Sequence, residues 1–291
     1  MSVREEHAEL IRRYLDALLA LDLDALGSTF SDDVVEQFPQ SGERLRGRAA
    51  ITAMLARQPA PPRLLAGPFV TSCSEELALA EAKFAYGGDP WWFVDRFELG
   101  GGRIRRMTSY FGEPFEAPAW RRPFVALEPR IDPGRWADDG DGQSVDRGVA
   151  DRYLRALARH DAATASSCLH PDYRGLYPQS GERFDASGAL AIDAAYPGGL
   201  PKAHELEIGG GRDEWVVTPA NVPLRLSGES DTWFGEALLE YATGERLFTV
   251  VVDVFRDGLV WRERSYYCPP FEVPGWRSGL VERIEPAVAL D

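Results

Sequence analysis

Cysteine, histidine and methionine are scarce in this chain. Of its 291 residues, three are Cys, four are His and three are Met. The three cysteines, Cys73, Cys168 and Cys268, lie far apart, which excludes a disulfide framework and indicates a reducing compartment. No histidine is spaced from another His or from a Cys as metal ligands are, so we expect no metal site.

Positive charge and long apolar runs are lacking as well. The net charge is −14, which argues against a nucleic-acid partner and against binding to anionic membranes. No apolar run approaches the ~18 residues that a membrane-spanning helix needs, and residues 1–10 contain no apolar signal-peptide core. No phosphate-binding glycine motif follows an expected strand, so we expect no nucleotide cofactor. These absences predict a cytoplasmic protein without a cofactor.

A long internal repeat organises the chain. The sequence Pro-Gln-Ser-Gly-Glu-Arg at residues 39–44 recurs at residues 178–183, an offset of 139. Residues 109–121 recur as residues 265–277, an offset of 156, and share the pattern Pro-Phe-Glu-x-Pro-x-Trp-Arg. Two long matches in the same order indicate a tandem duplication of one domain.

The repeat predicts two domains, at residues 1–128 and 144–286. Residues 129–143 between them are rich in Pro, Gly and Asp, which is typical of a linker. An ordered crossing segment held by Trp136 is the alternative.

Each copy is predicted to be α+β, with helices first and a meander of antiparallel strands after them. In the first copy we expect helices at 3–20, 24–30 and 48–57, and strands at 34–38, 64–73, 77–86, 91–99 and 103–111. In the second copy we expect helices at 145–159, 161–169 and 186–195, and strands at 173–177, 203–208, 213–218, 233–242, 247–255 and 259–267, with a longer hairpin or loop around 220–231. The prediction is two tandem cone-shaped α+β barrel domains, each with three helices on a curved, mainly antiparallel sheet that encloses a conical cavity.

Several short motifs resemble the nuclear transport factor 2-like superfamily, which includes ketosteroid isomerases, SnoaL-type polyketide cyclases and limonene-epoxide-hydrolase-like enzymes. Arg-Tyr-Leu-Asp-Ala-Leu at 13–18 and Phe-Ser-Asp-Asp at 30–33 look like the first helix of ketosteroid isomerase and the turn after it. Val-Asp-Arg-Phe at 94–97 looks like part of its last hairpin. The two repeated signatures look more like those of a broad bacterial group of SnoaL-like proteins.

The resemblance implies an oxyanion hole in each copy. The isomerase's oxyanion-hole tyrosine, on the first helix, matches Tyr14, and its oxyanion-hole aspartic acid matches Asp95. In the second copy Tyr153 and Asp253 fill the same places. The alternatives are a core tyrosine on the helix and an aspartate that ties strands together by a salt bridge or a backbone hydrogen bond.

This sequence differs from the isomerase at the position of the catalytic base, which in the isomerase is an Asp directly before a Pro on the first strand. Here Phe38 and Tyr177 stand at that position, and neither abstracts a proton from carbon as a carboxylate does. A base would have to come from Glu36, from water bound to Gln37, or from Glu240.

The residues around Asp95 mark it as a candidate site residue independently of the resemblance. At the strand period of two, Trp91, Phe93 and Phe97 share its face, so its carboxyl group lies among aromatic rings. Removal from water disfavours the charged form, so we expect a raised pKa and a protonated Asp95 that donates a hydrogen bond.

Further aromatic side chains are predicted to contact a ligand. Tyr110 and Tyr266 lie on the last strand of each copy and face either the cavity or the opposite side of the sheet. The full set of predicted substrate contacts is Phe38, Trp92, Tyr110, Tyr177, Trp233 and Tyr266.

The repeated Pro-Gln-Ser-Gly-Glu-Arg motif is predicted to be a turn that seats the third helix. Its Pro ends a strand, Ser-Gly turns the chain, and Glu43 is expected to pair with the adjacent Arg44 at the mouth of the cavity. A role of Gln40 and Gln179 at the rim of the pocket is the alternative.

Two functions from different classes remain open. The first is a cofactor-free isomerase, cyclase or hydrolase that acts on a small hydrophobic carbonyl compound through a Tyr–Asp oxyanion hole. The second is a non-catalytic small-molecule-binding or scaffold protein, since the usual base is missing from both copies. In a third variant only the second copy is active. In each case we expect a monomer whose two repeats pair sheet to sheet as an intramolecular pseudo-dimer.

Overall fold

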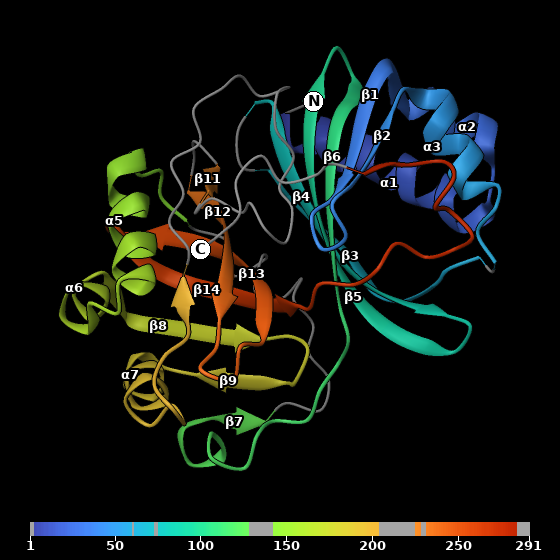
Figure 1. Ribbon diagram of the computed structural model, residues 1–291. Coiled ribbons are helices and arrows are strands. Elements are labelled where there is room, and N and C mark those ends of the chain that lie inside the picture. Colours follow the sequence, from blue (N-terminus) through green and yellow to red (C-terminus); the bar gives the residue numbers. More distant parts are fainter. Residues whose placement is uncertain are drawn as a thin grey trace. The chain divides into compact units, whose positions relative to one another are not determined.

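The computed structural model describes residues 3–59, 61–72, 75–127, 142–203, 225–227 and 231–283 (Figure 1). The described chain divides into two compact units. Unit 1 holds the described residues up to 111 together with 270–283, and unit 2 holds those from 112 to 269. Cys73, Trp136 and the expected strand at 213–218 lie outside the described residues. So does most of the expected strand at 203–208, of the expected linker and of the expected loop.

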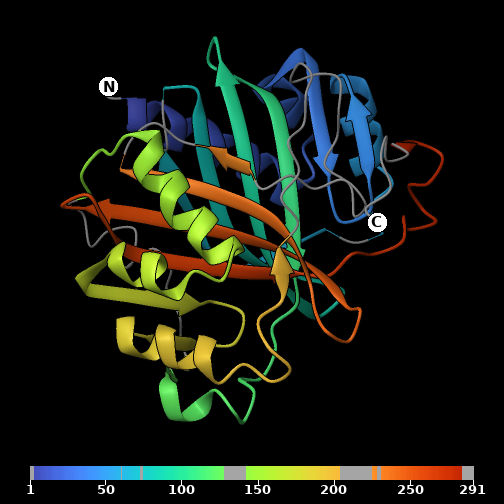
Figure 2. The same ribbon diagram turned by 60° about the vertical axis from the view of Figure 1, so that its left-hand side comes forward.

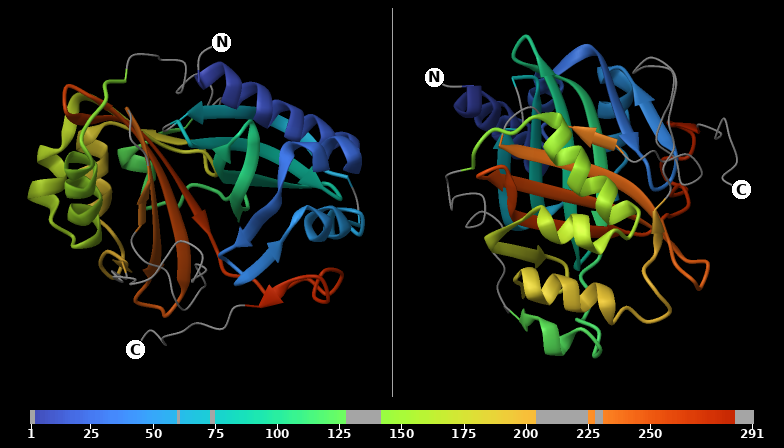
Figure 3. Two further views of the ribbon diagram at one scale, coloured as in Figure 1. Left: turned by 90° about the horizontal axis from the view of Figure 1, so that it is seen from above. Right: turned by 90° about the vertical axis from the view of Figure 1, so that its left-hand side faces the viewer.

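Unit 1 consists of helices on one face of a curved sheet. The helices are α1 (Val3–Ala20), α2 (Leu23–Thr29) and α3 (Arg48–Leu55), and α1 lies along the sheet (Figure 3). The strands are β1 (Phe30–Phe38), β2 (Glu43–Arg46), β3 (Arg63–Ser72), β4 (Leu77–Tyr86), β5 (Asp89–Gly100), β6 (Arg103–Gly112) and β15 (Glu282–Arg283). Their order is β15-β2-β1-β6-β5-β4-β3, and the pair of β1 and β6 is parallel.

Unit 2 repeats this arrangement. Its helices are α5 (Arg147–Ala158), which crosses one face of the sheet in Figure 2, α6 (Ala162–Ser167) and α7 (Ala186–Ala194). Its strands are β7 (Ala126–Leu127), β8 (Leu169–Tyr177), β9 (Glu182–Phe184), β10 (Lys202–Ala203), β11 (Arg225–Ser227), β12 (Thr232–Glu240), β13 (Arg246–Arg256) and β14 (Leu259–Cys268). The order is β10-β12-β13-β14-β8-β9-β7, β11 pairs with β12, and β8 and β14 are parallel.

Local chemistry explains why the helices begin where they do. The Asp22 carboxylate accepts a hydrogen bond from the backbone N–H of Ala25 over 2.9 Å and so caps α2. Asp161, its counterpart at the offset of 139, caps α6 through the N–H of Thr164 over 3.0 Å. The duplication therefore kept not only the elements but also their start signals.

The predicted fold class is confirmed: each unit is α+β, with helices on a mainly antiparallel sheet. The expected strand at 77–86 matches β4, but β1 begins at Phe30, four residues earlier than expected. The short strands β2 and β9 were not expected, and neither were β7 and β15. The domain ranges 1–128 and 144–286 stay a prediction, as does the sheet-to-sheet pairing of the repeats.

Each unit takes its last strand from the other repeat. We call residues 112–127 the first arm and residues 270–283 the second arm. The first arm ends in β7, which pairs with β9 of unit 2, and the second arm ends in β15, which pairs with β2 of unit 1 (Figure 3). Both units are therefore assembled from residues of both repeats.

Candidate functional site

In unit 1, Tyr14, Glu36 and Asp95 form a polar group inside an apolar core, which we call site 1. Glu36 stands opposite Met107 across the parallel pair of β1 and β6, and Met107 belongs to the core beneath the helices. Asp95 alternates with Phe93 and Phe97 along β5, and the ring of Phe97 lies 5.6 Å from that of Tyr14 on α1. Both carboxyl groups therefore point to the helix-covered face of the sheet.

The carboxyl groups of site 1 are almost fully removed from water. Glu36 is 5% exposed and Asp95 is 7% exposed. Oε2 of Glu36 and Oδ1 of Asp95 have no hydrogen-bond partner among the described residues. Buried polar atoms normally have hydrogen-bond partners, so these two oxygens are the atoms of site 1 that could bind a ligand.

Burial shifts both groups toward neutrality. It raises the pKa of Asp95 to about 7, although a hydrogen bond with Ser109 lowers it in part. It raises the pKa of Glu36 to about 8, helped by the negative charge of Asp95 and opposed by the positive charge of Arg277. The pKa of Tyr14 is also raised well above its ordinary value, first by burial and then by Asp95 and Glu36. Between pH 7 and 8 the pair therefore carries about one proton, and Glu36, with the higher pKa, holds the larger share of it.

In unit 2 the equivalent group is Tyr153, Asp253 and Glu263, which we call site 2. Asp253 and Glu263 are direct partners across β13 and β14, so their side chains share one face. The Tyr153 hydroxyl donates to Oε2 of Glu263 over 2.5 Å, and the Ser265 hydroxyl donates to Oε1 over 3.1 Å. Tyr173 adds a further hydrogen bond to Glu263.

The two carboxyl groups of site 2 have different surroundings. Burial raises the pKa of Glu263, but the hydroxyl groups of Tyr153 and Ser265 stabilise its ionised form and oppose the rise. Burial and the negative charge of Glu263 raise the pKa of Asp253 well above its ordinary value, and its Oδ1 has no hydrogen-bond partner among the described residues. The surroundings therefore favour the ionised form at Glu263 and the neutral form at Asp253.

The two sites place their glutamate on different strands. The offsets of the repeat align Glu36 with Gly175 and Met107 with Glu263. Gly175 stands opposite Glu263, just as Glu36 stands opposite Met107. A Cβ at Gly175 would come within 2.3 Å of the Phe184 ring, so β8 has no room for the glutamate that β1 carries. The carboxyl group is supplied by the neighbouring strand instead.

The other predicted site residues divide between the faces of the sheets. Phe38, Tyr177 and Trp233 belong to the cores on the helix-covered faces, and Trp233 pairs directly with Asp253. Tyr110 follows Ser109, whose side chain reaches Asp95, so Tyr110 points to the opposite face.

Trp92 and Tyr266 also lie on the faces opposite the carboxyl groups. Trp92 pairs with Lys83, whose ammonium nitrogen lies 5.6 Å from the ring centroid. Tyr266 pairs with Val250. Each lies three residues from Glu263 or Asp253 on its own strand, so both side chains point to the opposite face of the sheet. Their role as ligand contacts stays a prediction, but the structure does not bring them to either site.

Among the three proposed sources of a base, only Glu36 lies beside the Tyr–Asp group. Glu240 forms an ion pair with Arg246 over 3.0 Å. Gln37 follows Glu36 directly on β1, so its side chain points to the opposite face of the sheet. Glu263 was not expected from the sequence. The available signal was a charged residue at the position where the first repeat has the core residue Met107.

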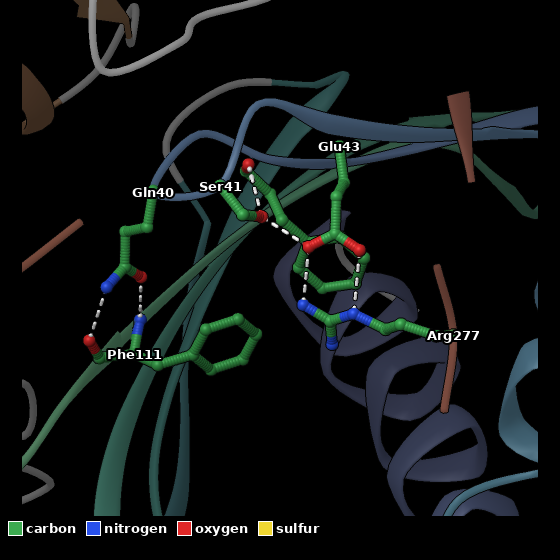
Figure 4. Close-up of polar contacts among 6 residues, drawn as sticks. Gln40, Ser41, Glu43, Phe111 and Arg277 are labelled. Atoms are coloured by element: carbon green, nitrogen blue, oxygen red, sulfur yellow. Dashed lines mark hydrogen bonds and ion pairs between the residues drawn. The ribbon is translucent and has the colours of Figure 1, made fainter. Parts of the chain in front are cut away.

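The expected ion pair of Glu43 with Arg44 is wrong. Glu43 binds Arg277 of the second arm through two hydrogen bonds of 2.7 and 2.6 Å, and Arg44 pairs with Glu282 over 2.7 Å. Adjacent residues of a strand point to opposite faces, so Glu43 and Arg44 cannot meet. Gln40 is structural: its amide exchanges two hydrogen bonds with the backbone of Phe111, over 2.9 and 2.6 Å (Figure 4).

Residues 11–107 match the family model of the SnoaL-like domain. The first repeat is therefore a SnoaL-like domain, as its motifs suggested, and the second repeat has the same order of elements around the same parallel strand pair. A comparison with curated proteins found no match.

Several solved structures are similar to part of the chain. One is an NTF-2-like protein of unknown function from Burkholderia xenovorans LB400, at 30% identity and a TM-score of 0.40 over 44% of this chain and 99% of that one. Another is a provisionally named ketosteroid isomerase from Kribbella flavida, at 25% identity and a TM-score of 0.39 over 44% of this chain and 93% of that one. An LEH-like epoxide hydrolase from M. tuberculosis is 22% identical, with a TM-score of 0.32 over 37% of this chain and 84% of that one.

Two further findings concern the described residues only. None of the described helices is long and apolar enough to cross a membrane. No three His, Cys, Asp or Glu side chains come together as metal ligands in the described part of the chain. The expectations of no cofactor and no nucleic-acid partner stay predictions.

Proposed function

We propose that each unit binds a small, mostly apolar molecule with a carbonyl oxygen and transfers a proton on it with the chain's own carboxyl and phenol groups. The observation that carries this proposal is the buried carboxyl pair in each unit, in which one oxygen each of Asp95, Glu36 and Asp253 has no hydrogen-bond partner among the described residues. A reaction of this class is an isomerisation, a cyclisation or a hydrolysis. The oxyanion roles of Tyr14, Asp95 and Asp253 belong to this proposal, whereas the hydroxyl group of Tyr153 donates its one hydrogen to Glu263.

In site 2 the roles follow from the surroundings of each carboxyl group. Glu263, as carboxylate, accepts the proton of a C–H bond next to the carbonyl group. The electron pair moves to the carbonyl oxygen, and the protonated Asp253 stabilises that oxygen by donating a hydrogen bond. Glu263 then returns the proton to carbon. In site 1 the proton lies more often on Glu36, whose pKa is the higher one, and the minor form with Glu36 ionised and Asp95 protonated has the same division between base and donor as site 2.

The proposal is tested by hydrogen–deuterium exchange at the α-carbon of 2-tetralone, an apolar bicyclic ketone, followed by proton NMR in D2O. We expect the protein to accelerate the exchange, and we expect the Glu36→Gln/Glu263→Gln double variant to lose about 10²–10⁴-fold in rate. Glu245→Gln is the matched control, because Glu245 is exposed. Full exchange activity in the double variant would contradict the proposal.

A second candidate is a binding protein that performs no chemistry. It is favoured by Phe38 and Tyr177, which stand where the resemblance implies a base and which line the helix-covered faces. The fluorescence of 2-naphthol, a flat aromatic molecule with one acidic hydroxyl group, reports binding independently of catalysis. Binding of 2-naphthol without exchange of 2-tetralone would favour this candidate.

A further inference from the structure

The two arms make the same contacts with the unit that each completes. Arg121 of the first arm donates two hydrogen bonds to Glu182, over 2.8 and 2.7 Å, as Arg277 of the second arm does to Glu43. Both glutamates are fully buried and both arginines are less than 9% exposed. Buried, bidentate pairs of this kind fix the positions of both partners.

The backbone of each arm repeats the correspondence. The N–H of Phe115 donates to the carbonyl oxygen of Gln179 over 3.2 Å, and the N–H of Phe271 donates to that of Gln40 over 3.1 Å. The short strands β7 and β15 then add the last pairings of each sheet. The repeated Pro-Gln-Ser-Gly-Glu-Arg motif is therefore the receptor for the arm of the other repeat.

The arm arginines also reach the aromatic residues beside the carboxyl groups. The guanidinium carbon of Arg277 lies 4.6 Å from the centroid of the Phe38 ring, and that of Arg121 lies 5.2 Å from the centroid of the Tyr177 ring. Phe38 alternates with Glu36 on the same face of β1. Figure 4 shows the two hydrogen bonds that join Arg277 to the carboxylate of Glu43.

We propose that each site is completed by the other repeat: Arg277 is a positioning residue of site 1, and Arg121 is a positioning residue of site 2. Arg277 holds the end of β1 and the Phe38 ring, and through them the alignment of Glu36. Arg121 holds the end of β8 and the Tyr177 ring, and β8 in turn pairs with β14, the strand that carries Glu263. A single repeat then lacks a part of its own site. The duplication thus gives each site the arm that it needs from the other repeat. That this arm supports catalysis rests on the proposed function.

The charge of Arg277 predicts the direction in which the pKa of Glu36 changes when Arg277 is replaced. The positive charge lowers the pKa of Glu36, against burial, Asp95 and Glu43, which all raise it. The phenol groups of Tyr14 and Tyr86 also face this pair, and neither ionises near neutral pH, because burial raises the pKa of each. Removal of the Arg277 charge therefore moves the titration of Glu36 upward.

The test follows the carboxyl titration of Glu36 by 13C NMR in the full-length chain labelled at its Glu side chains. We expect Arg277→Gln to raise the pKa of Glu36 by roughly half a unit or more. Arg121→Gln, in the identical motif of the other arm, should leave Glu36 unchanged. Arg277→Lys keeps the charge and should restore the titration toward that of the unmodified protein.

A second measurement covers the case in which Arg277→Gln does not fold. The Glu43→Gln/Arg277→Gln double variant leaves no buried charge unpaired, and Glu36 should still titrate higher in it, because Arg277 acts on Glu36 more strongly than Glu43 does. In denaturant unfolding, Glu43→Gln should couple with Arg277→Gln and be additive with Arg121→Gln. Coupling with Arg121→Gln instead, or an unchanged Glu36 titration in both Arg277 variants, would overturn the inference. A protein that shows the titration shift but no exchange of 2-tetralone would retain the inference and lose the proposed function.

Discussion

Glu263 and Gly175 are direct partners across β14 and β8, and unit 1 fills the same two positions with Met107 and Glu36. The carboxyl group has thus moved from one strand to its neighbour while it stayed beside the Tyr–Asp pair. The two repeats therefore differ in the strand that carries the glutamate, but both keep a buried carboxyl pair next to the tyrosine of their first helix.

The lack of space at Gly175 leads to a first prediction. Gly175→Ala should destabilise the protein by about 1–3 kcal/mol, because the added Cβ would lie 2.3 Å from the Phe184 ring and 2.7 Å from the Tyr173 hydroxyl. Gly148→Ala is the control: no atom lies within 4 Å of its added Cβ and it lies in a helix, so we expect a small gain in stability. Denaturant unfolding measures both, and equal stability of the two variants would contradict the close packing.

Below pH 7, where its carboxyl group is protonated, Asp95 should act as a neutral hydrogen-bond donor, so binding is measured at pH 6. Asp95→Asn keeps a side chain that donates a hydrogen bond, so we expect it to retain the affinity for 2-naphthol, whereas Asp95→Ala should weaken binding about tenfold. Fluorescence titration of both variants measures the difference. An equal loss in both would mean that Asp95 is needed in its ionised form.

Glu36 should make the protein less stable as the pH rises. Its pKa in the folded protein is about 8, against an ordinary value of 4.5, so the folded state binds more protons than the unfolded state between these values. The free energy of unfolding therefore falls from pH 4.5 to 8 and levels off above. Glu36→Gln should flatten this slope, and the exposed Glu245→Gln should not. Parallel pH profiles of melting temperature for Glu36→Gln and the unmodified protein would be evidence against the raised pKa.

The hydroxyl group of Tyr153 should hold Glu263 in its ionised form. Its hydrogen bond of 2.5 Å lowers the pKa of Glu263, so Tyr153→Phe should raise that pKa. The alkaline shift should be visible in the pH profile of 2-tetralone exchange by site 2, measured in a Glu36→Gln background. No shift in this profile would show that Tyr153 does not act on the base.

The sequence predicted most of the fold because its signals are local. The alternation of Asp95 with Phe93 and Phe97 placed the carboxyl group correctly, and Glu36 was among the proposed bases. Glu263 was not predicted as a site residue because its position opposite Asp253 depends on the register between β13 and β14. The alternation of residues within a single strand does not contain this register.

The crossing of each arm to the other repeat could not be predicted from the sequence, for a different reason. The motif around Glu43 is identical to the one around Glu182, and both arms carry the same arginine. Local chemistry is therefore equally satisfied when each arm stays with its own repeat or crosses to the other. Only the path of the chain in three dimensions decides that Glu43 pairs with Arg277 and Glu182 with Arg121.

The central claim is that each unit keeps a buried proton near neutral pH. The most direct measurement is a 13C NMR titration of the protein labelled at its Asp and Glu carboxyl groups, with resonances assigned through Glu36→Gln and Asp95→Asn. We predict two resonances that titrate near pH 7 and 8 and disappear in these variants. Titration of both carboxyl groups near 4, the ordinary range of Asp and Glu, would contradict the account.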